Sequence, residues 1–192
     1  MKKVGVLSLQ GDFEAHGRVL EREGVTPVYV RNSEDLDGLD GLIIPGGEST
    51  TMLKLMGYED LLKPIAEFGR RKPMFGTCAG AILMASEVSN PAQESLSVMD
   101  IAVERNGYGR QIDSRVVQLD PEAAFEERTA PGKLDAVFIR APIIREVGGD
   151  ARVLARYNGD PVLVEQGKHL VATFHPELTN DSRVHRYFLE KL

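Results

Sequence analysis

The chain has 192 residues, one cysteine and a formal net charge of −6 at pH 7, with 42% hydrophobic and 27% charged residues. This composition is that of a globular protein, and the length predicts one α/β domain, residues 1–192, rather than a disordered or fibrous chain. The acidic charge disfavours nucleic acid and anionic lipid as partners. A single cysteine cannot form an internal disulfide, which is consistent with a reducing compartment. No apolar run reaches the roughly 20 residues of a membrane span, so the sequence predicts a cytoplasmic protein.

The first half of the sequence alternates between strand and helix patterns. Residues 4–9 form a continuous apolar run that is typical of a strand buried on both faces, and an amphipathic segment follows Gln10-Gly11. The same order recurs at the strand-like residues 41–45 and 73–75. Also predicted are a strand at 25–30 and helices from about Ser49, around 61–68 and at 79–86. This repetition predicts a three-layer α/β fold, with a mostly parallel central sheet flanked by helices.

From residue 96 onward the pattern changes to short β-like segments without a helical period. Residues 96–103 and 112–119 predict an antiparallel extension of the sheet. Later strands are predicted at 136–139, 152–157, 161–166 and 169–174, with hairpin turns at Asn158-Gly159 and Gln166-Gly167. A closing helix is predicted with Val184, Tyr187, Phe188 and Leu192 on one face and Asp181 or Ser182 as N-cap.

The single cysteine lies in Gly76-Thr-Cys-Ala-Gly80, between two glycines that allow a sharp backbone turn. Cys78 would follow a strand and precede a helix, which is the elbow that exposes a nucleophile in α/β hydrolases. A helix N-terminus also favours the thiolate over the thiol. The sequence therefore predicts that Cys78 is a nucleophile, with a small buried cysteine as the alternative.

A cysteine nucleophile needs a base, and His175 has the best setting of the four histidines. It lies in Thr-Phe-His-Pro-Glu177, directly after an apolar segment, so it too should lie at a strand end. In an extended backbone Glu177 points to the same side, about 7 Å along the chain, where its carboxylate can orient the imidazole. Cys78, His175 and Glu177 thus form a triad by role, and a structural histidine is the alternative. The other histidines, His16, His169 and His185, resemble helix-face or hairpin residues, and no pair has the spacing of metal ligands.

An acyl-transfer site also needs N–H donors for the developing oxyanion. The backbone at Gly46-Gly47 and at Ala79 offers them, although a plain strand-to-helix turn would also explain the two glycines. If the adjacent Glu48 binds an α-ammonium group of the substrate, an arginine should bind the α-carboxylate. Arg105 and Arg140 are candidates because both are attached to strand-like runs, where a surface ion pair is the alternative role.

Assembled, these features resemble class I glutamine amidotransferases, and more closely the PdxT family, the glutaminase subunits of pyridoxal 5′-phosphate synthase. The residues that carry the resemblance are 5–11, 42–52 with PGGEST, 72–80, 103–106, 137–142 with FIRAP, and 174–179. They run from the first predicted strand to the last predicted helix, and PGGEST with FIRAP is more specific than the triad. The resemblance implies a class I glutamine amidotransferase-like, flavodoxin-like fold.

The resemblance also implies an activity: hydrolysis of L-glutamine to L-glutamate and ammonia, without a cofactor or metal, and delivery of the ammonia to a synthase subunit (PdxS) that builds pyridoxal 5′-phosphate. Cys78 would form a thioester with the substrate, His175 would relay protons and Glu177 would orient His175. Gln10 would lie near the partner and help to organise the oxyanion site, so low activity is expected of the isolated chain. The positions that would hold glutamine are Gly47, Glu48, Ser49, Arg105, Ile139 and Arg140.

The sequence departs from the family pattern at two positions near functional segments. Ser8 stands where a glycine is expected, which predicts altered packing of the first loop, and Gly107-Tyr108 replaces a more usual Ser-Phe. Neither departure removes a group that the chemistry needs. Two other classes stay open: a DJ-1-like cysteine protein that senses oxidants or acts on carbonyl compounds, and a non-catalytic flavodoxin-like binding module in which Cys78 is incidental.

Overall fold

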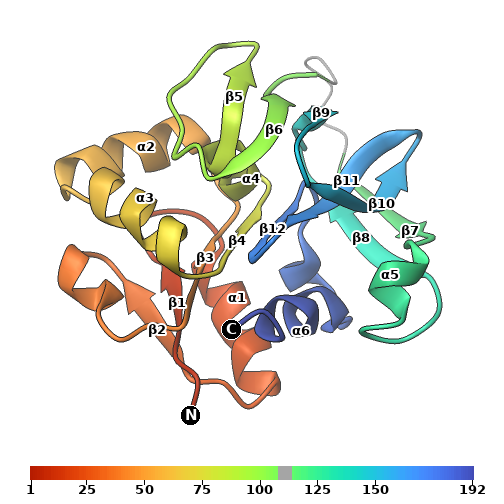
Figure 1. Ribbon diagram of the computed structural model, residues 1–192, viewed down its shortest axis with the longest axis horizontal. Coiled ribbons are helices and arrows are strands. Elements are labelled where there is room, and N and C mark those ends of the chain that lie inside the picture. Colours follow the sequence, from red (N-terminus) through yellow and green to blue (C-terminus); the bar gives the residue numbers. More distant parts are fainter. Residues whose placement is uncertain (108–113) are drawn as a thin grey trace.

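The protein, described here for residues 1–107 and 114–192 of a computed structural model, has a seven-stranded sheet at its centre (Figure 1). Tyr108 and the predicted strand residues 112 and 113 lie outside the described residues. The strands of this sheet are β1 (Val4–Leu7), β2 (Pro27–Val30), β3 (Gly41–Ile44), β4 (Met74–Thr77), β10 (Arg152–Tyr157), β11 (Asp160–Gln166) and β12 (His169–Ala172). Their order is β10-β11-β12-β4-β3-β1-β2. All neighbours from β12 to β2 pair in parallel, and β10 and β11 add an antiparallel edge.

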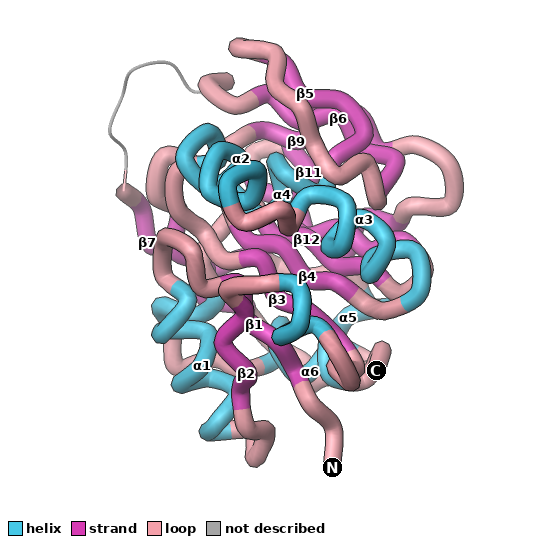
Figure 2. Tube along the Cα trace, turned by 90° about the vertical axis from the view of Figure 1, so that its left-hand side faces the viewer, coloured by secondary structure: helices cyan, strands magenta, loops and turns pink. Residues whose placement is uncertain are grey.

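Helices cover both faces of the central sheet, as the strand-then-helix order predicts. In Figure 2 the strands lie between α2 (Ser49–Tyr58), α3 (Leu62–Arg71) and α4 (Ala79–Met84) above and α1 (Phe13–Arg22) and α6 (Arg183–Leu189) below. The remaining helical segments are the short α5 (Ala123–Glu126) and the 3-10 turns η1 (Ser33–Leu36) and η2 (Pro176–Leu178). None of the helices in the described ranges combines the length and the apolarity that crossing a bilayer requires.

The continuous apolar strands are explained by burial on both faces. Along β3, Leu42 and Ile44 belong to the core shared with α2, α3 and α4, whereas Ile43 belongs to the core on the opposite face. In β4, Met74 and Phe75 divide in the same way. Successive side chains point to opposite faces of a strand, so both sets must be apolar when both faces are covered.

The strands predicted at 96–103 and 112–119 do make antiparallel pairs, but their described residues belong to two smaller sheets instead of extending the central one. One contains β5 (Ala85–Ser89), β6 (Met99–Glu104) and β9 (Ile143–Val147), and its β5–β6 pair is parallel. The other pairs β7 (Arg115–Leu119) with β8 (Leu134–Phe138). The alternating apolar residues of β6 are buried against the core of α2, α3 and α4. Alternation shows that one face of a strand is buried, but it does not identify the partner strand.

Other element boundaries differ in detail from the predictions. The helix predicted at 79–86 ends at Met84, since Ala85 has an extended backbone (ψ 153) and pairs with Met99. Both hairpin turns are confirmed, with positive φ at Asn158, Gly159 and Gly167. At the closing helix Ser182 is the N-cap residue without a side-chain cap bond, and the Asp181 carboxylate accepts the Arg183 N–H at 3.0 Å.

The register of the parallel strands brings three strand ends to one edge of the sheet. Ile44 of β3 lies beside Gly76 of β4, and Thr77 of β4 lies beside Ala172 of β12. The segments that follow these strands are Pro45-Gly46-Gly47, Cys78 and Thr173-Phe174-His175. All three predicted parts of the site therefore emerge from the carboxyl end of the sheet, where open α/β sheets bind their ligands.

Candidate active site

Cys78 lies at a tight elbow between β4 and α4. Its backbone has φ 49 and ψ −105, which is a strained conformation for a residue other than glycine. The glycines beside it have no room for a side chain: a Cβ on Gly76 would lie 2.5 Å from the carbonyl carbon of Gly80, and one on Gly80 would lie 2.1 Å from the carbonyl oxygen of Ile44. The Cys78 N–H donates to the carbonyl of Ala172 at 2.8 Å. These contacts explain why the thiol lies between two glycines.

His175 and Glu177 form a buried pair beside this elbow. His175 Nδ1 lies 2.6 Å from Glu177 Oε1, and the two side chains are 5% and 0% exposed. The backbone of His175 is held by its N–H bond to the carbonyl of Val137 at 2.8 Å. Asp12 brings a carboxylate within 4.8 Å of ligand atoms of His175 and Glu177, and His175 Nδ1 is already paired with Glu177.

Cys78 and His175 meet at Gly46. A Cβ on Gly46 would lie 2.4 Å from His175 Cε1 and 3.4 Å from Cys78 Cβ, so both side chains border the same glycine. Burial lowers the pKa of His175, but hydrogen bonds and charge interactions with Cys78 and Glu177 outweigh burial and raise this pKa to about 10. The imidazole is therefore protonated at neutral pH, between the Cys78 sulfur and the Glu177 carboxylate.

The predicted oxyanion segments border the same point. Ala79 is the first residue of α4, so its N–H has no acceptor within the helix. Gly47 has φ 156, and a Cβ there would lie 2.4 Å from Gln10 Oε1. Gln10 Oε1 accepts the N–H of Glu48 at 2.9 Å, and the Gly46 carbonyl accepts the N–H of Asp12 at 3.1 Å. These two hydrogen bonds join the first loop, residues 10–12, to residues 46–48.

The residues predicted to hold glutamine divide into two groups around the elbow. Glu48 and Arg105 lie together, with Glu48 Oε1 3.5 Å from Arg105 Nη2, and Arg105 also donates to Thr50 Oγ1 at 2.8 Å. Ser49 donates to Gln93 Oε1 at 3.3 Å. On the other side the Ile139 carbonyl is 3.9 Å from the Cys78 sulfur. The next residue, Arg140, is exposed and has a positive φ of 45.

Glu48 has a structural role that sequence reasoning missed. Its carboxylate caps α2 by accepting the N–H groups of Thr50 at 3.2 Å and Thr51 at 2.7 Å. Burial raises the pKa of Glu48, but the hydrogen bonds from Thr51 and Thr50 outweigh it and hold the pKa below its usual value. The group that is predicted to bind a cation is therefore anionic.

Two histidines near the site were also missed. His16 of α1 and His185 of α6 are both fully buried, and His16 Nε2 lies 3.5 Å from Glu177 Oε2. Their predicted positions on helix faces are confirmed, but those faces are buried. The signal was present in the sequence, because Val19 and Leu20 follow His16 at helical spacing and Phe188 and Leu189 follow His185 in the same way.

A thiol at an elbow beside a hydrogen-bonded histidine–carboxylate pair is the arrangement of an enzyme that acts on acyl groups through a cysteine nucleophile. Residues 6–192 match the SNO glutamine amidotransferase family, and the chain belongs to this family. A curated relative, the pyridoxal 5′-phosphate synthase subunit PdxT of Solibacter usitatus (strain Ellin6076), is 69% identical over 100% of both chains. The subunit of the same name from Koribacter versatilis (strain Ellin345) is 54% identical over 98% of this chain and 94% of the relative.

Solved structures agree with this assignment. One described as a glutamine amidotransferase is 46% identical, covers 98% of this chain and 97% of its own, and superposes with a TM-score of 0.89. A structure of PurLQS from Thermotoga maritima, 20% identical with a TM-score of 0.72 over 98% of both chains, shares the fold. The predicted PdxT resemblance, α/β fold class and glutaminase activity are confirmed, and the DJ-1-like and binding-module alternatives are set aside.

Proposed function

We propose that this glutaminase hydrolyses L-glutamine through Cys78, His175 and Glu177. Cys78 reacts as the thiolate, its S–H proton being the one that His175 carries; the sulfur attacks the carbonyl carbon of the side-chain amide and forms a C–S bond, while the carbonyl π electrons move to the oxygen and give a tetrahedral oxyanion. His175 donates a proton to the amide nitrogen as the C–N bond breaks, so ammonia leaves and a thioester remains. His175 then takes a proton from water, which attacks the thioester and releases glutamate and the thiolate. The observation that carries this proposal is the His175–Glu177 pair, 2.6 Å apart, beside the thiol.

Glu177 makes His175 suitable for both proton transfers. Its Oε1 accepts the Nδ1–H of His175, which leaves the other ring nitrogen free to exchange protons with the substrate. A carboxylate at 0% exposure also stabilises the imidazolium without competition from water.

We further propose that the surrounding predicted residues bind the substrate. The N–H groups of Ala79 and of the Gly46-Gly47 segment would stabilise the oxyanion. Glu48 would bind the α-ammonium group of glutamine, since its carboxylate is anionic. Arg105 or Arg140 would bind the α-carboxylate, and Gly47, Ser49 and Ile139 would complete the pocket.

Two wider features belong to the same proposal. Residues 1–192 act as one glutaminase domain in the cytoplasm, and the ammonia passes to a pyridoxal 5′-phosphate synthase subunit of the PdxS type. Support comes from the relatives, which are named as subunits of that synthase. Gln10 lies close to both the Gly47 position and the Glu48 N–H, so contact of a partner with the first loop would reach the oxyanion segment directly.

The deciding experiment is ammonia release from L-glutamine by the chain mixed with a pyridoxal 5′-phosphate synthase subunit. We expect release that depends on the partner and falls at least about a thousandfold in Cys78→Ala, because removal of a nucleophile leaves only binding and oxyanion stabilisation. Circular dichroism of the variant checks that it is folded. Release that survives in folded Cys78→Ala would show that another group is the nucleophile.

A further inference from the structure

A pair of histidines lies beneath the triad and takes no part in the mechanism above. His16 and His185 are both 0% exposed, and His16 Nδ1 lies 2.9 Å from His185 Nε2. Phe75 in β4 makes T-shaped contacts with both rings, with centroid distances of 6.2 and 5.5 Å. Two polar rings in the core cost desolvation free energy unless their nitrogens are hydrogen-bonded.

The second ring nitrogen of His16 points at the active site. His16 Nε2 lies 3.0 Å from Thr77 Oγ1, next to the nucleophile in the sequence, and 3.5 Å from Glu177 Oε2. Glu177 Oε2 is the carboxylate oxygen not bound to His175, and it is buried without a hydrogen-bond partner. His16 Nε2 is hydrogen-bonded to Thr77 Oγ1, and Glu177 Oε2 is a second oxygen near the same nitrogen, 0.5 Å further away.

The hydrogen-bond pattern selects one tautomer for each histidine. If His185 carries its proton on Nε2, it donates to His16 Nδ1, and His16 must carry its own proton on Nε2, facing Thr77 and Glu177. The reverse arrangement would aim a lone pair of His16 at the Glu177 carboxylate. It would also leave an N–H on His185 Nδ1, a buried atom without a partner. An orphaned buried N–H is rarer than an orphaned acceptor, so the first arrangement is favoured.

Burial keeps both rings neutral. It lowers the pKa of His185 to about 3, and burial, with repulsion from His185 and His175, holds the pKa of His16 well below its usual value. A neutral donor leaves the negative charge of Glu177 available to the His175 imidazolium, whereas a charged His16 would compete for it.

We propose that His16 is a positioning residue of the glutaminase: its Nε2–H, fixed by His185, lies between Thr77 Oγ1 and the second oxygen of Glu177, and its attraction for that oxygen keeps the carboxylate on His175. This inference rests on the triad proposed above. It assigns a role in the reaction to α1 and α6, which lie on the face of the sheet opposite α4.

Nuclear magnetic resonance tests the tautomers directly, because the chain has four histidines. Long-range ¹H–¹⁵N spectra of the wild-type protein at pH 7, assigned with His16→Gln and His185→Gln, should show both residues as neutral Nε2–H tautomers. A His16 resonance of the Nδ1–H tautomer, or of a charged ring, would overturn the proposal. This measurement does not require a folded His16→Leu protein.

Kinetics of the complex with the synthase subunit test the consequence. Mutation of a residue that orients a ligating histidine typically lowers activity about 10- to 100-fold. By analogy we expect His16→Leu to lower kcat by that factor with little change in KM. His16→Gln carries an amide N–H near the position of Nε2 and should restore at least half of the loss on a logarithmic scale.

The matched control is His169→Leu. His169 is also buried, at 7% exposure, and its Nδ1 accepts the Met74 N–H at 3.2 Å, but it lies at the start of β12, away from the triad. We expect this variant to lose stability and to keep kcat within about twofold. A folded His16→Leu with wild-type kcat, or a kcat loss that His16→Gln does not restore, would overturn the inference while the triad stands. A wild-type complex without hydrolysis, or with hydrolysis that survives Cys78→Ala, would overturn both proposals.

Discussion

At the scale of single residues, the site depends on glycines as much as on its reactive side chains. Gly46 is buried between His175 and Cys78, and its carbonyl is held by the N–H of Asp12. The absent side chain is what allows the imidazole and the thiol to approach each other. In the proposed mechanism Gly46 therefore matters through the side chain that it lacks as well as through its backbone.

Gly46→Ala should lower kcat by at least about 100-fold. The new Cβ would lie 2.4 Å from His175 Cε1 and must displace the ring, and a displacement of a catalytic group by about 1 Å can lower the rate by about that factor. The matched control is Gly57→Ala in α2, where a Cβ meets no atom within 4 Å. That variant should keep wild-type kcat and gain about 0.5–1 kcal/mol of stability, since alanine is the better helix former. Steady-state kinetics and urea unfolding of both variants check the prediction. Wild-type kcat in Gly46→Ala would mean that His175 is free to move.

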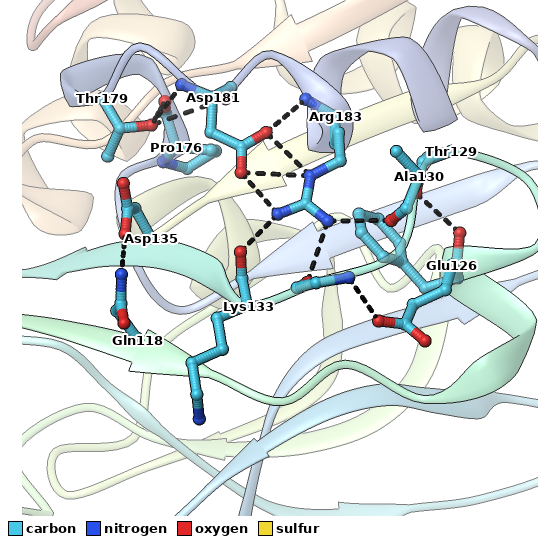
Figure 3. Close-up of polar contacts among 12 residues, drawn as sticks. Gln118, Glu126, Thr129, Ala130, Lys133, Asp135, Pro176, Thr179, Asp181 and Arg183 are labelled. Carbon is cyan, nitrogen blue, oxygen red and sulfur yellow. Dashed lines mark hydrogen bonds and ion pairs between the residues drawn. The ribbon is translucent and has the colours of Figure 1, made fainter.

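At the scale of elements, the segment that carries Glu177 is held by the arginine that begins α6. Arg183 binds both carboxylate oxygens of Asp181 and donates to the carbonyls of Ala130, Gly132 and Lys133 (Figure 3). On the other side of Asp181, its N–H donates to Thr179 Oγ1, and this hydroxyl donates to the carbonyl of Pro176 in η2. The chain of bonds joins η2 to the loop between α5 and β8.

Arg183→Ala should lower the free energy of unfolding by about 2–4 kcal/mol, because it removes several charge-assisted hydrogen bonds from side chains that are only 11% and 17% exposed. Arg183→Lys should recover less than half, since an ammonium group lacks the planar fork that reaches three carbonyls and a carboxylate. Arg186→Ala is the control on the same helix. The Arg186 side chain pairs with Glu23 but is 58% exposed, so we expect its removal to lower the free energy of unfolding by less than about 1 kcal/mol. Urea unfolding compares the three. Equal losses in Arg183→Ala and Arg186→Ala would contradict a special role for this cluster.

Elements with a strong local pattern were predictable from the sequence, and those decided by tertiary contacts were not. The apolar runs at β1 and β3 and the glycines around Cys78 reflect burial and backbone geometry, so they indicated the parallel sheet and the elbow. The short β5, β9 and α5 were not predicted. The strand β6 was assigned to the wrong sheet, because its partners are β5, which was not predicted, and β9, which is distant in sequence. The Glu48 cap was missed although a helix was predicted from about Ser49, because glutamate is not among the preferred N-cap residues. The contact of His16 with Glu177 joins residues 161 positions apart, which helical spacing alone does not indicate.

At the scale of the whole molecule, the fold buries three neutral histidines on different elements. Burial lowers the pKa of His16, of His185 to about 3 and of His169 to about 4, whereas each would titrate near 6.5 in the unfolded chain. Between pH 6.5 and about 4 the unfolded chain therefore binds more protons at these positions than the folded chain. Protonation then favours unfolding, so the stability present above pH 6.5 is lost as the pH falls. His175 does not add to this loss, because its raised pKa leaves it charged in both states at acid pH.

Urea unfolding at intervals from pH 7 to pH 5 should show this loss before most carboxylates titrate. Each buried histidine contributes at most about 1.4 kcal/mol per pH unit, so the three together give a limiting slope of about 4 kcal/mol per pH unit. His169→Leu removes one titrating group without touching the triad. It should start from a lower stability at pH 7, yet lose less per pH unit than the wild type, by up to one third. A flat profile between pH 7 and pH 5, or the same slope in His169→Leu, would mean that the acid sensitivity of the fold does not come from its buried histidines.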